Sequence, residues 1–197
     1  MIHLNGNILC AVDCETTGLD CNYHDVIEFA CCPLDSQLRP HSEIMPFACQ
    51  IKPRFPERAD PRALRVNNLK LADLMVDGVD YHESGDAFID WFQRLNLREG
   101  KKIMPLAQVW SFDKGFIKEW LGKENFEYHF HYHARDTCST ALYLNDRADL
   151  RNEKIPYPKV SLQYLASQLS VPTERTHRAT EDALTCAEVY RRLLVAG

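Results

Sequence analysis

A short apolar run that ends in two acidic residues constrains this chain more than any other feature. Residues 8–12 read Ile-Leu-Cys-Ala-Val, and the stretch Asp13-Cys14-Glu15-Thr16-Thr17-Gly18 follows directly. An apolar run of this length predicts a buried strand. Since alternate residues of a strand point to the same face, Asp13 and Glu15 are expected to place two carboxylates side by side at its end.

Two adjacent carboxylates at the end of a buried strand repel each other unless a positive charge lies between them. Hard divalent ions such as Mg²⁺ and Mn²⁺ meet this need because they bind carboxylate oxygens. Gly18 allows a sharp turn that brings the backbone close to a ligand. Solvated acids at an ordinary strand end would show the same Asp-x-Glu pattern, so the metal hypothesis depends on further acids downstream.

The length and composition are typical of one soluble globular domain. The chain has 197 residues, of which 45% are hydrophobic and 26% are charged, and we expect residues 1–197 to form a single domain. The formal net charge of -5 excludes a generally basic nucleic-acid binder. A polyanionic partner would therefore have to be held by a local basic patch or by metal ions.

The cysteines and the absence of long apolar runs predict an intracellular, cytoplasmic protein with no membrane partner. The sequence shows no apolar run of membrane-spanning length, and its opening residues do not resemble a signal peptide. None of the eight cysteines has Cys-x-x-Cys spacing, and several lie inside apolar runs. We therefore expect free, buried thiols in a reducing compartment rather than disulfides or a zinc site.

The remaining pattern predicts an α/β fold with a mixed sheet and helices on both faces. Short connections make the first three strands an antiparallel meander, and later strands alternate with helices. Pro105 suggests that the fourth strand lies at an edge or begins near this residue. The further strands are expected at 26–32, 47–51 and 103–107, and the helices at 84–97 with Ser84 as N-cap, 113–121, 136–144, 161–169 and 178–194.

Two segments allow more than one interpretation. Residues 52–70 are rich in Lys and Arg and could flank a phosphate backbone, or they could form a solvated surface. Residues 126–133 alternate like a strand, so that His129, His131 and His133 would share one face. Such histidines could bind a transition metal, although a polar strand face is the more common explanation.

Four acids at the ends of predicted elements suggest a two-metal site. They are Asp13, Glu15, Asp113 and Asp182, and His177 stands near the last of them. Four carboxylates balance the charge of two divalent ions, which in such sites lie about 4 Å apart and clamp the attacking and leaving oxygens of a phosphodiester. A histidine with a pKa near its ordinary value of about 6.5 can take the proton of an attacking water.

Three motifs in this order resemble those of the DEDDh (DnaQ-like) 3′-to-5′ exonucleases of the ribonuclease H-like superfamily. The motifs are Asp13-Cys14-Glu15-Thr16-Thr17-Gly18, Phe112-Asp113 and His177-Arg178-Ala179-Thr180-Glu181-Asp182. The resemblance spans residues 8–194. It implies a ribonuclease H-like fold and a hydrolase that removes nucleoside 5′-monophosphates from the 3′ end of single-stranded nucleic acid.

The resemblance also assigns roles to individual residues. It implies that two Mg²⁺ ions, replaceable by Mn²⁺, are bound by Asp13, Glu15, Asp113 and Asp182, with Asp13 bridging both, and that His177 is the general base. Thr16 and Thr17 would contact the sugar and phosphate of the terminal nucleotide, and Leu19 would pack against its base. Arg178 would form a local salt bridge or a phosphate contact, and Cys14 should point to the core.

The second motif departs from the family pattern. The family usually has His or Gly, then Asn and a small residue before Phe-Asp, whereas this chain has Gln108-Val109-Trp110-Ser111. Gln108 could replace part of the lost hydrogen bonding, and Trp110 could fill the core or narrow the cleft. The departure leaves the metal ligands in place, but substrate binding by this motif is expected to differ from that of the family.

Several alternatives stay open on the sequence. DNA is slightly favoured over RNA, with an exoribonuclease that trims RNA 3′ ends as the second enzymatic possibility. A non-catalytic nucleic-acid-binding protein on the same fold is the alternative from another class. The short stretch after the last predicted helix weakly favours a free-standing enzyme over a polymerase partner, and no helix face indicates an oligomeric state.

Overall fold

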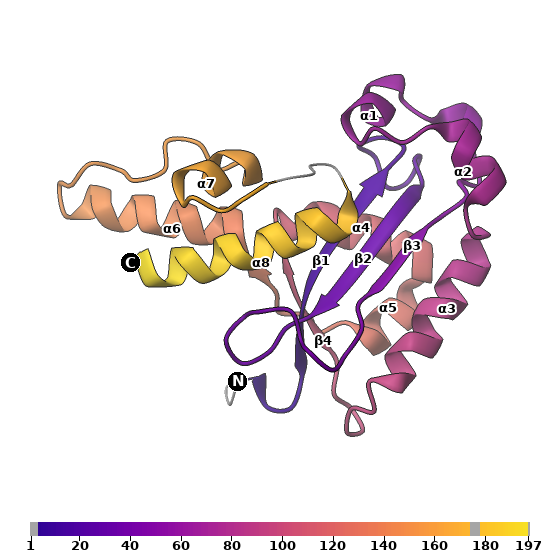
Figure 1. The fold of residues 1–197 in the computed structure, drawn as a ribbon, viewed down its shortest axis with the longest axis horizontal. Coiled ribbons are helices and arrows are strands. Elements are labelled where there is room, and N and C mark those ends of the chain that lie inside the picture. Colours follow the sequence, from indigo (N-terminus) through magenta and orange to yellow (C-terminus); the bar gives the residue numbers. More distant parts are fainter. Residues whose placement is uncertain (1–3, 174–177, 197) are drawn as a thin grey trace.

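A five-stranded mixed sheet forms the centre of the protein (Figure 1). The computed structural model describes residues 4–173 and 178–196. The strand order is β3-β2-β1-β4-β5, in which β1 pairs antiparallel with β2 and parallel with β4. β3 continues the antiparallel meander and β5 pairs parallel with β4, so the predicted mixed sheet is confirmed. The strands are β1 (Ile8–Thr16), β2 (Val26–Pro33), β3 (Phe47–Gln50), β4 (Ile103–Ala107) and β5 (Arg135–Asp136).

Helices cover both faces of this sheet, as predicted. One core cluster joins α6, α7 and α8 to the sheet through Leu9 and Ala11 of β1, while the other joins α3, α4 and α5 to it through Cys10 and Val12. The alternation of β1 thus serves two cores at once. The helices are α1 (Pro61–Val66), α2 (Leu71–Asp77), α3 (Tyr81–Arg94), α4 (Trp110–Leu121), α5 (Lys123–His129), α6 (Thr137–Leu150), α7 (Leu162–Gln168) and α8 (Ala179–Ala196), with a short 3-10 turn at Pro56–Arg58.

The strand predicted over residues 126–133 is wrong in its first half, because residues 126–129 belong to helix α5. Phe130 caps the end of this helix, where its N–H donates to the carbonyl of Phe126 and its ring stacks on that of Phe126 with centroids 5.2 Å apart. His129 packs at its ring edge against Phe92 and is buried, whereas His131 and His133 lie beyond the helix. Among the described residues the histidines do not form a metal site.

Hydrogen bonding corrects the predicted start of α3. α3 begins at Tyr81 because the Asp80 carboxylate caps it, accepting from the backbone N–H groups of His82 and Glu83. Ser84, the predicted cap, is buried within the helix and donates its hydroxyl to the carbonyl of Tyr81.

Pro105 lies in an internal strand rather than at an edge. The backbone of Lys102 faces β1, and that of Ile103 faces residue His131 on the other side. Since residues two apart face the same neighbour, the nitrogen of Pro105 points toward the β5 side. The ladder with β5 begins only at Leu106, so the missing N–H of the proline breaks no β1–β4 hydrogen bond.

All eight cysteines are free, and five of them are buried, namely Cys10, Cys14, Cys31, Cys32 and Cys186. None of the helices in residues 4–173 and 178–196 combines the length and apolar character needed to cross a membrane.

The turn that leads from β4 into α4 contains a strained residue. Val109 has φ 59° and ψ 59°, in the left-handed region. A β-branched side chain there is unusual, and the conformation costs about 1–2 kcal/mol for an L-residue. Asparagine tolerates this region better than valine does.

Replacing Val109 by Asn should therefore stabilise the protein. Val109 is 42% exposed, so little packing is lost, and we expect the free energy of unfolding to rise by about 1 kcal/mol. Urea unfolding measures the change. Val76→Asn is the matched control, because Val76 is 79% exposed on α2 and does not adopt a left-handed conformation. A loss of stability on Val109→Asn would show that the conformation of Val109 is not strained.

Candidate active site

Three of the predicted acids meet where β1 ends. Asp13 and Glu15 share the face of β1 that carries Leu9 and Ala11, which is the face covered by α8. Asp182 lies in the first turn of α8 and is buried. Carboxylate oxygens of Asp13, Glu15 and Asp182 all lie within 4.8 Å of one another.

Asp113 approaches the same place from the opposite face of the sheet. It is buried in the first turn of α4, and its Oδ1 accepts hydrogen bonds from the backbone N–H of Cys14 (3.2 Å) and from its thiol (3.3 Å). Cys14 points to the α4 side, as predicted, because it alternates with Asp13 and Glu15. All four acids line one cavity of about 360 Å³.

Burial and mutual repulsion raise the pKa values of these acids. Burial raises the pKa of Asp13 well above its usual range, and the charge of Asp113 raises it further. Burial also raises the pKa of Glu15 to about 8, and Asp182 adds to the shift. The pKa of Asp113 rises to about 7 because burial outweighs the hydrogen bonds from Cys14. Without a cation the site therefore holds protons near neutral pH.

This donor set fits a hard divalent cation. It consists of carboxylate oxygens close enough to share an ion, without a sulfur or nitrogen ligand in the group. Such oxygens are what Mg²⁺, Mn²⁺ and Ca²⁺ prefer. A bound cation would also remove the repulsion that raises the pKa values.

An ion pair between a buried glutamate and an exposed arginine attaches the start of α8 to the sheet. Glu28 of β2 lies opposite Glu15 in the strand register and is buried. Its carboxylate accepts from the guanidinium of Arg178, with Nη2 to Oε1 at 2.8 Å, and from the backbone N–H of Ala179 at 3.2 Å. The salt bridge expected for Arg178 is confirmed, although its partner is distant in sequence. Because Ala179 begins α8, the pair holds the helix that carries Asp182.

Sequence reasoning overlooked Glu28. The residue is the only acid in the apolar run Val26-Ile27-Glu28-Phe29-Ala30-Cys31-Cys32. A lone acid in a strand buried on both faces needs a cation or hydrogen-bond donors, and this was the signal that could have revealed it.

Two of the three residues expected to contact the terminal nucleotide, Thr16 and Leu19, line a second hollow of about 420 Å³ beside the acids. Leu19 is 83% exposed on its rim, and Thr16 lines it with its hydroxyl donated to the carbonyl of Gly18. Thr17 is fully buried, and both its N–H and its hydroxyl bond to the backbone of Asp25. Thr17 therefore closes the loop after β1, and its contact with substrate stays a prediction. His177 lies outside the described residues.

The unusual second motif has structural partners. The Gln108 side chain lines the acid cavity, donates to the carbonyl of Val160 at 2.7 Å, and accepts from the hydroxyl of Thr137. Trp110 is buried and stacks on Phe126, so it fills the core rather than narrowing the cleft. Gln108 thus ties the site to the start of α6 and to the segment before α7.

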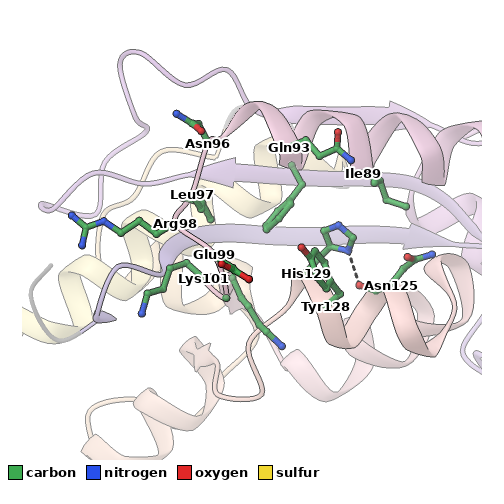
Figure 2. Close-up of a pocket in the computed structure, with 13 residues that line it drawn as sticks. Ile89, Gln93, Asn96, Leu97, Arg98, Glu99, Lys101, Asn125, Tyr128 and His129 are labelled. Atoms are coloured by element: carbon green, nitrogen blue, oxygen red, sulfur yellow. Dashed lines mark hydrogen bonds between the residues drawn. The ribbon is translucent and has the colours of Figure 1, made fainter.

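A larger hollow, of about 690 Å³, lies elsewhere (Figure 2). α3, α5 and the residues before β4 line it, including Phe92, Lys101 and His129. Because β1 and β4 are parallel, the start of β4 lies at the opposite end of the sheet from the acids. Its lining contains none of the acids of the predicted site, so size alone does not identify the active site here.

Comparisons with known proteins identify a family and a shared fold. A family model described as RNase_T, Exonuclease, matches residues 10–190. E. coli exonuclease I in complex with a dT13 oligonucleotide has a TM-score of 0.71 at 17% identity, covering 94% of this chain and 40% of its own. Cell-death related nuclease 4 has a TM-score of 0.71 at 18% identity, covering 97% and 64%. A 3′-exonuclease described with a histone mRNA stem-loop has a TM-score of 0.69 at 15% identity, covering 97% and 64%.

These structures share the fold, and this chain spans less than two thirds of the length of each. A search of curated protein sequences found no match. The family model covers most of the chain, from before Asp13 to beyond Asp182. The chain therefore belongs to the RNase_T exonuclease family, the DnaQ-like nucleases with a ribonuclease H-like fold.

Proposed function

We propose that this protein is a metal-dependent 3′-to-5′ exonuclease that hydrolyses single-stranded nucleic acid from its 3′ end. The observation that carries the proposal is the convergence of Asp13, Glu15 and Asp182 within 4.8 Å, with Asp113 in the same cavity. In the reaction a water oxygen bonds to phosphorus and the bond from phosphorus to the upstream 3′ oxygen breaks. The terminal nucleotide leaves as a nucleoside 5′-monophosphate.

The four carboxylates would hold two Mg²⁺ ions, with Mn²⁺ able to replace them. When bound, the two ions would supply neutralising charge for the phosphate and lower the pKa of the attacking water. Asp13 would contact both ions, and the support is that its carboxylate feels the charges of Asp113, Glu15 and Asp182 alike. Asp113 is held by its hydrogen bonds from Cys14, which leave less freedom to its carboxylate.

His177 would act as the general base and accept the proton of the attacking water. The support is its place in the sequence, because His177 directly precedes Arg178, and the ion pair with Glu28 holds Arg178 at the start of α8. An imidazole with a pKa near neutrality is suited to this transfer.

The hollow beside the acids would receive the terminal nucleotide. Its lining is mainly apolar, with Leu19, Ala63, Val66 and Phe112 around it, which suits a base of any identity. The related structures include complexes with dT13 and with a histone mRNA stem-loop, so their substrates span DNA and RNA. We propose DNA as the preferred substrate of this chain and trimming of RNA 3′ ends as the second candidate.

A gel assay with 5′-labelled single-stranded DNA and RNA tests the proposal. We expect a descending ladder that requires Mg²⁺ or Mn²⁺ and is abolished by EDTA, and the faster substrate distinguishes DNA from RNA. Asp13→Asn should remove the activity, because it removes a shared ligand. Asp86→Asn on the exposed face of α3 is the matched control and should leave the ladder unchanged.

A second variant separates the base from the metal ligands. His177→Ala should reduce turnover by about 10²–10⁴-fold, while stabilisation by Mg²⁺ persists. Binding of the oligonucleotide without any cleavage by the wild type would instead favour the non-catalytic nucleic-acid-binding alternative.

The raised pKa values predict how stability depends on pH. The folded protein binds more protons than the unfolded chain between the ordinary Glu pKa of 4.5 and the value of about 8 for Glu15. In EDTA, stability should therefore fall as the pH rises through this window. Mg²⁺ should reverse the loss, most strongly near pH 8, because it stabilises the ionised acids.

Thermal unfolding at pH 5 and pH 8, with EDTA or Mg²⁺, measures this effect. Asp13→Asn should show a smaller decline with pH and a smaller response to Mg²⁺. A wild-type melting temperature that is insensitive to Mg²⁺ at pH 8 would show that the acids do not share an ion.

A further inference from the structure

Three of the six basic residues of the segment 52–70 make internal contacts. Arg54 binds Asp25 at 2.8 Å, and its guanidinium lies 4.1 Å from the ring centre of Tyr81. Arg58 lies over the ring of Phe55 at 3.8 Å, and Arg62 pairs with Asp60 at 2.9 Å. Half of the basic residues of this segment thus contact the loop itself. A nucleic-acid strand that bound here would compete with these internal contacts.

A second basic surface, which was not recognised in the sequence, lies along α4. A groove of about 310 Å³ runs between α4, α5 and the segment after α5, and Lys102, Lys114 and Lys118 line it. Among the described residues none of these lysines forms an ion pair with a carboxylate. Glu127 is the one acid of the lining. The groove therefore carries unpaired positive charge in a chain whose net charge is -5.

Aromatic side chains accompany the lysines. Tyr132 lines the groove and is 78% exposed, and His131 stacks on it with ring centroids 4.5 Å apart and an interplanar angle of 22°. Phe126 and Phe130 form the buried floor. Exposed rings next to lysines that have no carboxylate partner are the combination that holds single-stranded nucleic acid, because bases stack on rings while phosphates meet ammonium groups.

The topology leads this groove to the acids. The segment after α5 runs parallel to β4, from the bridge between Phe130 and Ile103 to the pairing of Asp136 with Ala107. There the Asp136 carboxylate accepts from the backbone N–H of Trp110, the first residue of α4. On the other wall, Lys114 directly follows Asp113 in α4. Both walls therefore end beside the acid cavity.

We propose that this lysine groove binds the single strand on the 5′ side of the nucleotide being removed. Lys114 and Lys118, one helical turn apart, would each meet a phosphate, and Tyr132 would stack on a base farther from the 3′ end. The proposal rests on the proposed exonuclease function and adds a strand-binding surface outside the cavity of the acids. The proposed ligand of the groove is a single-stranded nucleic acid and not an acidic protein.

The test compares a long substrate with one that is too short to reach the groove. For Lys114→Gln/Lys118→Gln, KM for a 15-nucleotide strand should rise by about tenfold at low salt, while kcat/KM for the p-nitrophenyl ester of thymidine 5′-monophosphate stays unchanged. The salt dependence of log KM should also weaken by about 1.4 in slope, or roughly 0.7 for each lost phosphate contact. Tyr132→Ala should raise KM for the long strand by about tenfold without altering the salt slope.

Arg151→Gln/Lys154→Gln is the matched control. It removes the same charge from exposed positions in the loop after α6, away from α4 (Figure 1). The proposal is overturned if this control raises KM as much as the α4 variant, or if the α4 variant affects short and long substrates alike.

A direct binding measurement tests the groove independently of catalysis. Fluorescence anisotropy of a labelled 15-mer in EDTA should show about tenfold weaker binding by Lys114→Gln/Lys118→Gln even if the wild type cleaves nothing. A 15-residue polyglutamate peptide should compete poorly with the strand. Equal competition would assign the groove to an acidic protein, and unchanged binding by the variant would remove the groove from strand recognition.

Discussion

The structure depends on carboxylates that the fold brings together against their mutual repulsion. Asp13, Glu15 and Asp182 lie within 4.8 Å, and burial with like charge raises the pKa of Glu15 to about 8. A chain that only needed stability would gain from apolar residues here, because desolvated like charges oppose folding. The arrangement is favourable when a divalent cation is present to bind the ionised oxygens.

Both faces of β1 take part in holding the acids. Alternate side chains of β1 point to opposite faces of the sheet. Asp13 and Glu15 therefore lie on the face covered by α8, while Cys14 lies on the other face and its N–H donates to Asp113 of α4. The Glu28 carboxylate binds Arg178 and caps the start of α8. The two halves of the site therefore come from opposite layers of the fold, and the single strand between them sets their separation.

Local patterns explain what could be predicted from the sequence. The apolar run before Asp13 marks a buried strand whatever surrounds it, and the order of the acids indicates the family. The prediction for residues 126–133 failed because alternation over a short stretch is compatible with both a strand and a helix, and in the structure the N–H of Phe130 donates to the carbonyl of Phe126 and closes the last turn of α5. The left-handed Val109 and the lysine groove depend on backbone geometry and on contacts between distant segments, which pattern alone does not contain.

The most direct test of the metal site is an anomalous difference map from crystals soaked in Mn²⁺. The proposed two-metal site predicts two peaks within reach of Asp13, Glu15, Asp113 and Asp182, about 4 Å apart, with Asp13 in contact with both. Peaks elsewhere, or none at these carboxylates at saturating Mn²⁺, would contradict it.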